Sequence, residues 1–320
     1  MRSRRHQSPT GVALCYDHTR PTKMLSAAIL MYHRVANLTP DVNRLCVSPD
    51  VFRQHMEALR VHGQPMTLAD LGHAVVDGDS PPRAVAVTFD DGCLDNLTVA
   101  SEILQEFDIP ATFFVPTEQL NQKREYWWDT LERIFADAGE IPLVLDLPGD
   151  AETYRTDTAE TRAKTHDVLA VRMRQARLDE REHILAHVMA WADIDLSPRD
   201  THRPMVADEL LTLSQSPGHT LGAHSVHHLS LPTLEGAAQR SEILDSKAML
   251  ESLVGVEVTA FAYPYGHYDA ASAEITGTAF KLAVTAMPGT ITRGANRTAL
   301  PRIDASRLTI DDLSRLVDSL

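Results

Sequence analysis

The chain has 320 residues, of which 30 are basic and 44 acidic, so its formal net charge at pH 7 is −14. That length is enough to bury a large core, either as one α/β barrel or as a domain with an insertion. The acidic balance argues against nucleic-acid binding, which needs the opposite charge, and three scattered cysteines (Cys15, Cys46 and Cys93) argue against a disulfide framework or a cysteine-rich zinc module.

The first 24 residues are basic, and we expect them to form a disordered N-terminal tail. Tyr16 and Asp17 lie where a signal peptide needs its apolar segment. No apolar stretch approaches the roughly 18–20 residues needed to span a bilayer. The sequence therefore predicts no membrane span and a cytoplasmic location, with ordered structure beginning near Leu25.

The next part of the chain alternates between strand and helix patterns. Apolar, β-branched runs mark the strands, whereas Phe52, Met56 and Leu59 recur at helical spacing. The expected elements are a strand at 27–32, a helix from 48, a strand at 84–89, a helix at about 96–107 and a strand at 109–115. Strand, helix and strand at this spacing form a βαβ unit, which implies parallel pairing.

The alternation stops at Glu118, where a long, charged and helix-prone segment begins. We predict a mostly helical insertion at about 118–206. The pattern then resumes with a strand at 220–223, a helix at 239–253 and further strands at 258–263, 282–285 and 299–303. Residues 25–320 are thus expected to form one α/β domain that the insertion interrupts.

Polar side chains gather where three of these strands end. Asp90 and Asp91 follow one strand, His224 and His228 follow another, and Tyr263-Pro-Tyr-Gly266 closes a third. Since functional groups of parallel α/β folds collect at the carboxyl ends of strands, these groups should share one rim. One carboxylate and two imidazoles suit a divalent ion such as zinc with a position left open, which is the arrangement for metal-assisted hydrolysis.

The two aspartates should have different roles. Neighbouring side chains of an extended strand point to opposite faces, and Gly92 lets the backbone turn directly after them. One carboxylate is therefore expected to bind the ion, and the other to act as a base outside the coordination sphere.

A second histidine pair, His183 and His187, is predicted to be structural. The two have the i, i+4 spacing of a zinc-protease helix, but Ile184 stands where that motif needs glutamate. We therefore place this pair on the surface of the insertion.

The aromatic run Tyr126-Trp-Trp128 opens the insertion. Its rings could stack on sugar faces, or they could anchor the insertion to the barrel as core. Because large aromatic side chains are usually buried, we favour the second interpretation.

Thr88-Phe-Asp-Asp-Gly92 and His224-Ser-Val-His-His228 resemble the first two motifs of the polysaccharide deacetylases, the NodB-homology family also called carbohydrate esterase family 4. The resemblance runs from about Met31 to Ile303, without the insertion. It implies a distorted parallel (β/α) barrel with fewer than eight strands. It also implies that Asp90 is the base and that Asp91, His224 and His228 bind one divalent ion, with Zn²⁺ expected first and Co²⁺, Ni²⁺ or Mn²⁺ as alternatives.

Two later motifs depart from the family pattern. The family commonly has arginine where Ala262 stands, and Arg302, at the end of a late strand, is our candidate for the missing charge. The resemblance makes the backbone N–H of Tyr265 the donor to the oxyanion. No histidine follows His267 to protonate the leaving amine, so His267 and His33 are the replacement candidates.

The activity implied by the resemblance is removal of N-acetyl groups from amino-sugar units of a glycan or glycan precursor by a metal-activated water. An N-acetylated carbohydrate is thus the expected partner, and the sequence does not identify protein partners. Two hydrolytic alternatives stay open, namely an amidase or cyclic imide hydrolase, and an O-acetyl esterase. The departures at Ala262 and after His267 also leave open a barrel that only binds glycan or metal.

Overall fold

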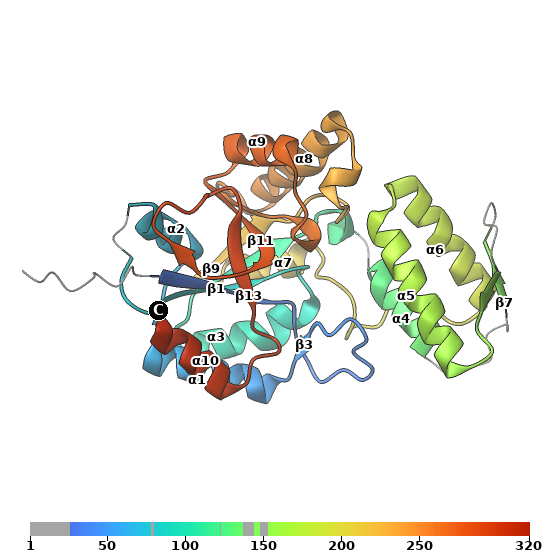
Figure 1. The fold of residues 1–320 in the computed structure, drawn as a ribbon, viewed down its shortest axis with the longest axis horizontal. Coiled ribbons are helices and arrows are strands. Elements are labelled where there is room, and N and C mark those ends of the chain that lie inside the picture. Colours follow the sequence, from blue (N-terminus) through green and yellow to red (C-terminus); the bar gives the residue numbers. More distant parts are fainter. Residues whose placement is uncertain (1–25, 78–79, 122, 137–143, 148–152) are drawn as a thin grey trace, which may run out of the picture.

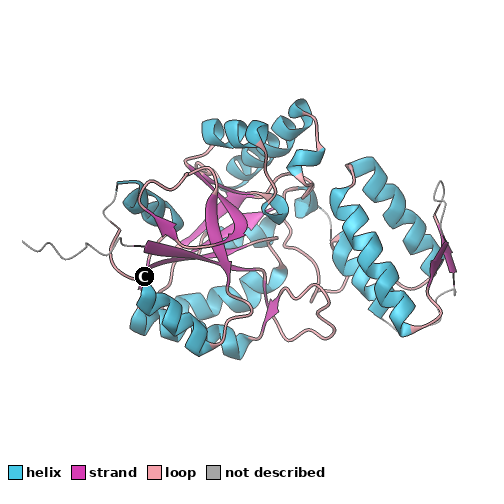
Figure 2. Ribbon diagram, viewed as in Figure 1, coloured by secondary structure: helices cyan, strands magenta, loops and turns pink. Residues whose placement is uncertain are grey.

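The computed structural model describes residues 26–77, 80–121, 123–136, 144–147 and 153–320 (Figure 1). The tail expected over residues 1–24 lies outside these described residues. A barrel of strands wrapped by helices makes up most of the molecule, and a mostly helical group lies to one side of it (Figure 2).

Seven parallel strands of the described chain close into a barrel, which confirms the predicted fold class. Around the ring they are β1 (Ser26–Tyr32), β5 (Ala84–Phe89), β6 (Ala111–Val115), β9 (His219–Ala223), β10 (Ala260–Ala262), β11 (Leu282–Pro288) and β13 (Leu300–Asp304). The short strands β4 (Gln64–Pro65) and β12 (Ile291–Thr292) extend the sheet beside β5 and β1. Closure places the carboxyl ends of β5 and β9 on one rim.

Helices surround the barrel. They are α1 (Pro49–His62), α2 (Leu68–Asp77), α3 (Ser101–Glu106), α7 (Ala207–Ser214), α8 (Gly236–Val254), α9 (Ala270–Ala279) and α10 (Ile310–Ser319). Short elements complete the frame: β2 (Arg34–Val35), β3 (Cys46–Val47) and the 3₁₀ turns Glu118–Asn121, Leu231–Thr233 and Pro264–Gly266. Ser48 caps α1 by accepting a hydrogen bond from the backbone N–H of Val51, as the sequence pattern predicts.

Some boundaries differ from the sequence expectations. The helix expected at 96–107 is a π-helical turn over Asn96–Ala100 that continues as α3. The strand expected from residue 109 begins at Ala111, since Pro110 has no N–H to give to the sheet and the N–H of Ile109 bonds to Leu104. Helices α2, α7, α9 and α10 were not predicted.

Side chains of β1 alternate between two hydrophobic clusters. Leu30 and Tyr32 pack with Phe52 of α1, whereas Ile29 packs with Leu71 of α2. The strand is therefore buried on both faces. One face packs against α1, and the other packs against residues of the other barrel strands, such as Ala86 and Val284, together with α2. The rim beyond the strands is therefore held by a rigid core.

Most of the chain between β6 and α7 forms a helical group with its own hydrophobic cluster. It contains α4 (Trp127–Ala136), α5 (Ala159–Gln175), α6 (Leu178–Ala192) and the antiparallel pair β7 (Val144–Asp146) and β8 (Thr153–Arg155). We call α4, α5 and α6, with Tyr126 before them, the insertion helices. The cluster includes Leu131, Leu169 and Val188. The buried ion pair of Arg34 with Asp129, at 2.7 Å, ties this group to the barrel.

Among the described helices, none combines the length and apolar character that crossing a membrane requires.

Candidate metal centre

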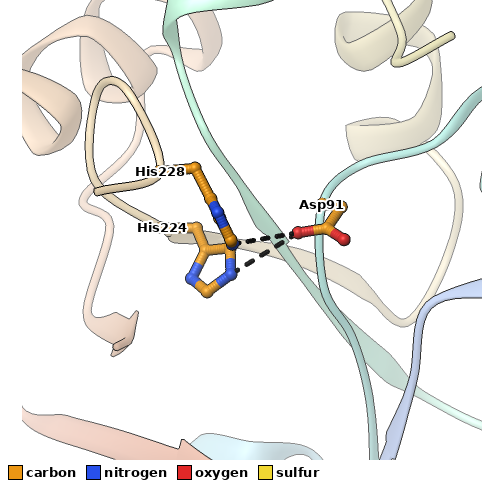
Figure 3. Close-up of side chains that lie close together, drawn as sticks. All are labelled: Asp91, His224 and His228. Carbon is orange, nitrogen blue, oxygen red and sulfur yellow. Dashed lines mark ion pairs between the residues drawn. The ribbon is translucent and has the colours of Figure 1, made fainter. Parts of the chain in front are cut away.

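Three side chains from two strand ends converge at the barrel rim. Asp91 follows β5, and His224 and His228 follow β9. Oδ1 of Asp91 lies 3.7 Å from Nε2 of His224 and 3.4 Å from Nε2 of His228 (Figure 3). All three side chains are buried. Barrel closure thus brings the three expected metal-ligating groups together.

The geometry of this group fits a single divalent ion. Two ligands bound at about 2.0–2.2 Å to a tetrahedral ion are separated by roughly 3.3–3.6 Å, which is close to the separations found here. Oδ1 of Asp91 is buried without a hydrogen-bond partner, as a ligand atom awaiting an ion would be. Nδ1 of His224 lies 2.7 Å from the carbonyl oxygen of Ala262, so that Nε2 is left to face the site.

Burial sets the protonation of these groups. It lowers the pKa of His224 to about 4 and that of His228 well below its ordinary value, so that both imidazoles are neutral at pH 7 and able to bind a cation. Burial, and next to it the charge of Asp90, raises the pKa of Asp91 to about 8. A bound divalent cation would offset this effect by favouring the carboxylate.

Asp90 faces a different partner from Asp91. Its Oδ1 and Oδ2 accept hydrogen bonds from Nη1 and Nη2 of Arg302, at 2.7 and 2.6 Å. Arg302 is buried on β13, where its Nε donates to the carbonyl of Thr285 at 2.8 Å. Burial alone would raise the pKa of Asp90, but the guanidinium of Arg302 lowers it to about 2. Asp90 is therefore ionised at neutral pH and lies beside the metal group.

Arg302→Met is expected to damage both stability and activity. It leaves the Asp90 carboxylate buried without its cation, which typically costs about 3–5 kcal/mol of unfolding free energy. Denaturant titration measures the stability loss. Arg297→Met, at an exposed residue of the same C-terminal part, is the control and should be close to wild type. Equal stability of the Arg302 and Arg297 variants would contradict this account of the ion pair.

Tight turns after the strands, rather than the strands themselves, set the orientation of the metal-ligating side chains. Asp91 and His228 have left-handed backbones with φ of 69° and 51°, as does Gly92 with φ of 59°. A non-glycine residue held there costs roughly 1–3 kcal/mol and persists only when its surroundings enforce it. The neighbouring Asp90 is still bonded to the barrel through its N–H, which donates to Tyr32.

The loop after β10 is equally constrained. Gly266 has φ of 72°, and a Cβ at this position would lie 2.5 Å from the backbone nitrogen of Ala286. Gly266→Ala is therefore expected to destabilise the protein by at least about 1–3 kcal/mol and to displace Tyr265. Thermal unfolding measures the effect. Gly236→Ala, where a Cβ would meet nothing within 4 Å, is the matched control and should unfold near the wild-type temperature.

A cleft of about 400 Å³ opens over the metal group. Its wall includes His33, Trp127, Trp128, Tyr265 and His267 together with Asp90 and Asp91. The ring centroid of His228 lies 4.5 Å from that of Tyr265 and 5.0 Å from that of Trp128. The two tryptophans are also buried in the cluster of the insertion helices, as expected for core residues. They serve both as core and as cleft wall.

Both histidines proposed to protonate the leaving amine line this cleft. Nδ1 of His267 is 3.0 Å from the hydroxyl of Ser230, and burial lowers the pKa of His267. Burial also lowers the pKa of His33, which follows β1. The cleft wall thus offers two imidazoles besides the metal group.

The second histidine pair of the sequence belongs to the insertion helices. His183 and His187 are on α6, with ring centroids 4.4 Å apart. Among the described residues, the pair is joined by no third histidine, cysteine or carboxylate within ligand distance. His183 is exposed and His187 half-buried, as expected for a pair on the surface of the insertion.

Sequence reasoning missed two residues that contact the metal-ligand loops. Tyr126 donates to the backbone carbonyl of Asp91, and Arg181 donates to the carbonyls of His227 and His228. No local motif marks either residue, since each acts on a backbone group far away in the sequence.

Comparisons with known proteins agree with this geometry. The sequence model of the family described as polysaccharide deacetylase matches residues 77–142 and 182–279, just over half of the chain. The protein YxkH of Bacillus subtilis (strain 168), whose name assigns it provisionally to the polysaccharide deacetylases, is 21% identical over 292 residues. That match covers 90% of this chain and 73% of YxkH.

Solved structures show the same fold. The Streptococcus pyogenes deacetylase PplD, solved in complex with acetate, superposes with a TM-score of 0.61 at 20% identity and covers 91% of this chain and 98% of its own. IcaB from Ammonifex degensii gives a TM-score of 0.62 at 17% identity, and the match covers 92% of this chain and 98% of IcaB. With its closed seven-stranded barrel, its Asp–His–His group and this sequence match, the chain belongs to the polysaccharide deacetylase family, the NodB-homology family of carbohydrate esterases.

Proposed function

We propose that this protein is a metal-dependent hydrolase that removes N-acetyl groups from amino-sugar units of a glycan or glycan precursor. One observation carries the proposal. A buried Asp91–His224–His228 group and a second, ionised carboxylate, Asp90, line the same cleft. The family membership and the cleft size are consistent with a sugar unit as substrate.

The donor set of one carboxylate and two imidazoles favours Zn²⁺ among the divalent ions. When bound, such an ion would polarise the acetyl carbonyl and make water more acidic. His224 and His228 are neutral and Asp91 faces them, so the three side chains are placed to hold the ion.

Asp90 is the base in this proposal and takes a proton from the attacking water. Arg302 holds the carboxylate ionised and fixed in orientation, since it bonds both oxygens. A carboxylate with so low a pKa is a weak base, and it is sufficient only for water that has already been made acidic. The backbone N–H of Tyr265 is the candidate donor to the oxyanion that forms on the acetyl group. Such a donor typically contributes about 2.7–4 kcal/mol.

Aromatic residues and histidines of the cleft wall have roles in this proposal. Trp127, Trp128 and Tyr265 provide apolar surface that can stack on a sugar ring and exclude water from the reacting atoms. His33 and His267 are candidates to protonate the leaving nitrogen, and Asp90 can return its own proton if neither does so.

The test is a comparison of substrates on the purified protein. Its rate should be measured with N-acetylated sugar oligomers, an O-acetylated sugar and a cyclic imide, after loading with Zn²⁺, Co²⁺, Ni²⁺ or Mn²⁺ in turn. The proposal is supported if the N-acetylated sugar oligomers are turned over, with release of acetate, faster than the O-acetylated sugar and the cyclic imide. Turnover confined to the O-acetylated sugar or to the imide would replace it with esterase or imide hydrolase activity.

A further inference from the structure

The backbone carbonyls of two metal-ligand residues accept hydrogen bonds from the insertion helices. The hydroxyl of Tyr126 donates to the carbonyl of Asp91 at 2.6 Å. Nη1 of Arg181, on α6, donates to the carbonyl of His228 at 3.2 Å. Both donors are buried, with 4% and 2% of their surfaces exposed, so water does not compete for these bonds.

These carbonyls belong to residues that the barrel strands do not fix. Asp91 lies beyond the end of β5 and His228 beyond the end of β9, and both have left-handed backbones. A left-handed residue persists where its surroundings determine its conformation. A hydrogen bond to the carbonyl fixes the peptide plane, and this plane sets the direction in which the side chain leaves the backbone.

Arg181 engages the His227–His228 turn at two points. While Nη1 bonds the carbonyl of His228, Nη2 donates to the carbonyl of His227 at 2.8 Å. The planar guanidinium offers several donors in a fixed fork and so holds two consecutive peptide planes. Within the described part of the chain, Arg181 forms no ion pair with a carboxylate. Both side-chain hydrogen bonds found for Arg181 go to the His227–His228 turn.

The third ligand residue is held differently. Nδ1 of His224 bonds the carbonyl of Ala262 on β10, at 2.7 Å. The barrel therefore orients His224, whereas the carbonyls of Asp91 and His228 accept hydrogen bonds from the insertion helices. The hydroxyl of Tyr265 is a second donor to the carbonyl of His228, at 3.3 Å. Aromatic packing adds a contact between the insertion helices and the metal ligands. The ring of Trp128 stacks on that of Tyr126, with centroids 4.3 Å apart, and lies against the ring of His228.

We infer that Tyr126 and Arg181 are positioning residues of the metal centre, so that docking of the insertion helices sets the affinity for the ion. The inference rests on the metal centre of the proposed function and goes beyond it by assigning a role to the insertion. Neither side chain is a ligand of the ion. Tyr126 acts through Asp91, and Arg181 acts through His228.

The test is the dissociation constant for Zn²⁺, measured by competition with a chromophoric chelator, for wild type, Tyr126→Phe and Arg181→Met. Substitution of groups that orient metal ligands typically weakens metal binding by about 10–100-fold. We expect about tenfold for Tyr126→Phe, which keeps the stacked ring, and a larger loss for Arg181→Met. Arg181→Lys, which restores one donor, should recover part of the affinity.

Two controls separate positioning from general structure. Tyr268→Phe and Arg177→Met make the same substitutions at exposed side chains and should bind Zn²⁺ as wild type does. Unfolding in excess chelator reports the stability of the metal-free fold, and a positioning role predicts weaker Zn²⁺ binding by variants that are still folded under the assay conditions. If Arg181→Met does not fold, Tyr126→Phe alone decides.

The outcomes distinguish this inference from the proposed function. Wild-type affinity in a folded Tyr126→Phe protein would overturn the positioning role and leave the hydrolase proposal intact. A wild-type protein that binds none of the four divalent ions would overturn both.

Discussion

Asp90→Asn is expected to abolish most turnover while the protein keeps its metal ion. The amide cannot accept the proton of water, and loss of a general base typically reduces the rate by about 10²–10⁴-fold. The ligands Asp91, His224 and His228 are untouched, so metal content should equal that of wild type. Steady-state kinetics together with elemental analysis of the same sample measure both quantities.

The matched control for this variant is Asp304→Asn. Asp304 ends β13, two residues beyond Arg302, and its carboxylate bonds Ser306 and pairs with Arg307 rather than with Arg302. Its replacement should leave turnover near the wild-type rate. Unchanged turnover in Asp90→Asn would remove Asp90 from the mechanism. If the wild-type protein binds the sugar but does not turn it over, the result would instead favour a binding protein.

Removal of the metal ion is the second change with a large expected effect. Chelation should stop turnover, and added Zn²⁺ should restore it, because the ion supplies the polarisation that no side chain of the cleft can supply. His228→Ala removes one of three ligands, so it should lose the ion and the activity together. Metal analysis and rate measurement before and after dialysis against chelator test this expectation.

His227→Ala is the matched control, since it changes the adjacent histidine. The ring of His227 faces Glu242, with Nδ1 2.6 Å from Oε1, and not the metal group. This variant should keep its ion. Bound metal also stabilises the folded state, by about 2.7 kcal/mol when the free ion is at 100 times its dissociation constant. The melting temperature of wild type and His227→Ala should therefore rise with Zn²⁺, whereas that of His228→Ala should not. A chelator-resistant rate would contradict metal dependence.

The sequence was most informative where local pattern and chemistry coincide. Strand β5 is apolar except for Thr88, and its end is marked by two carboxylates and a glycine, so both the strand and the polar rim could be predicted. The pair His224 and His228 was identified by spacing and residue type. Helix α9 was missed because it is built of small residues, with Ala, Ser, Thr and Gly giving no clear amphipathic stripe.

Other features depend on the closed barrel and the docked insertion. The bond of Arg302 to Asp90 joins residues 212 positions apart, and Arg181 reaches the carbonyl of His228 across 47 positions. Tyr126 meets the carbonyl of Asp91 across 35 positions. Residue type and local spacing determined which groups carry the chemistry. The departure at Ala262 had already suggested Arg302 as the partner of Asp90. The roles of Tyr126 and Arg181 were decided only by the tertiary structure, since hydrogen bonds to distant backbone carbonyls leave no periodicity or motif in the chain.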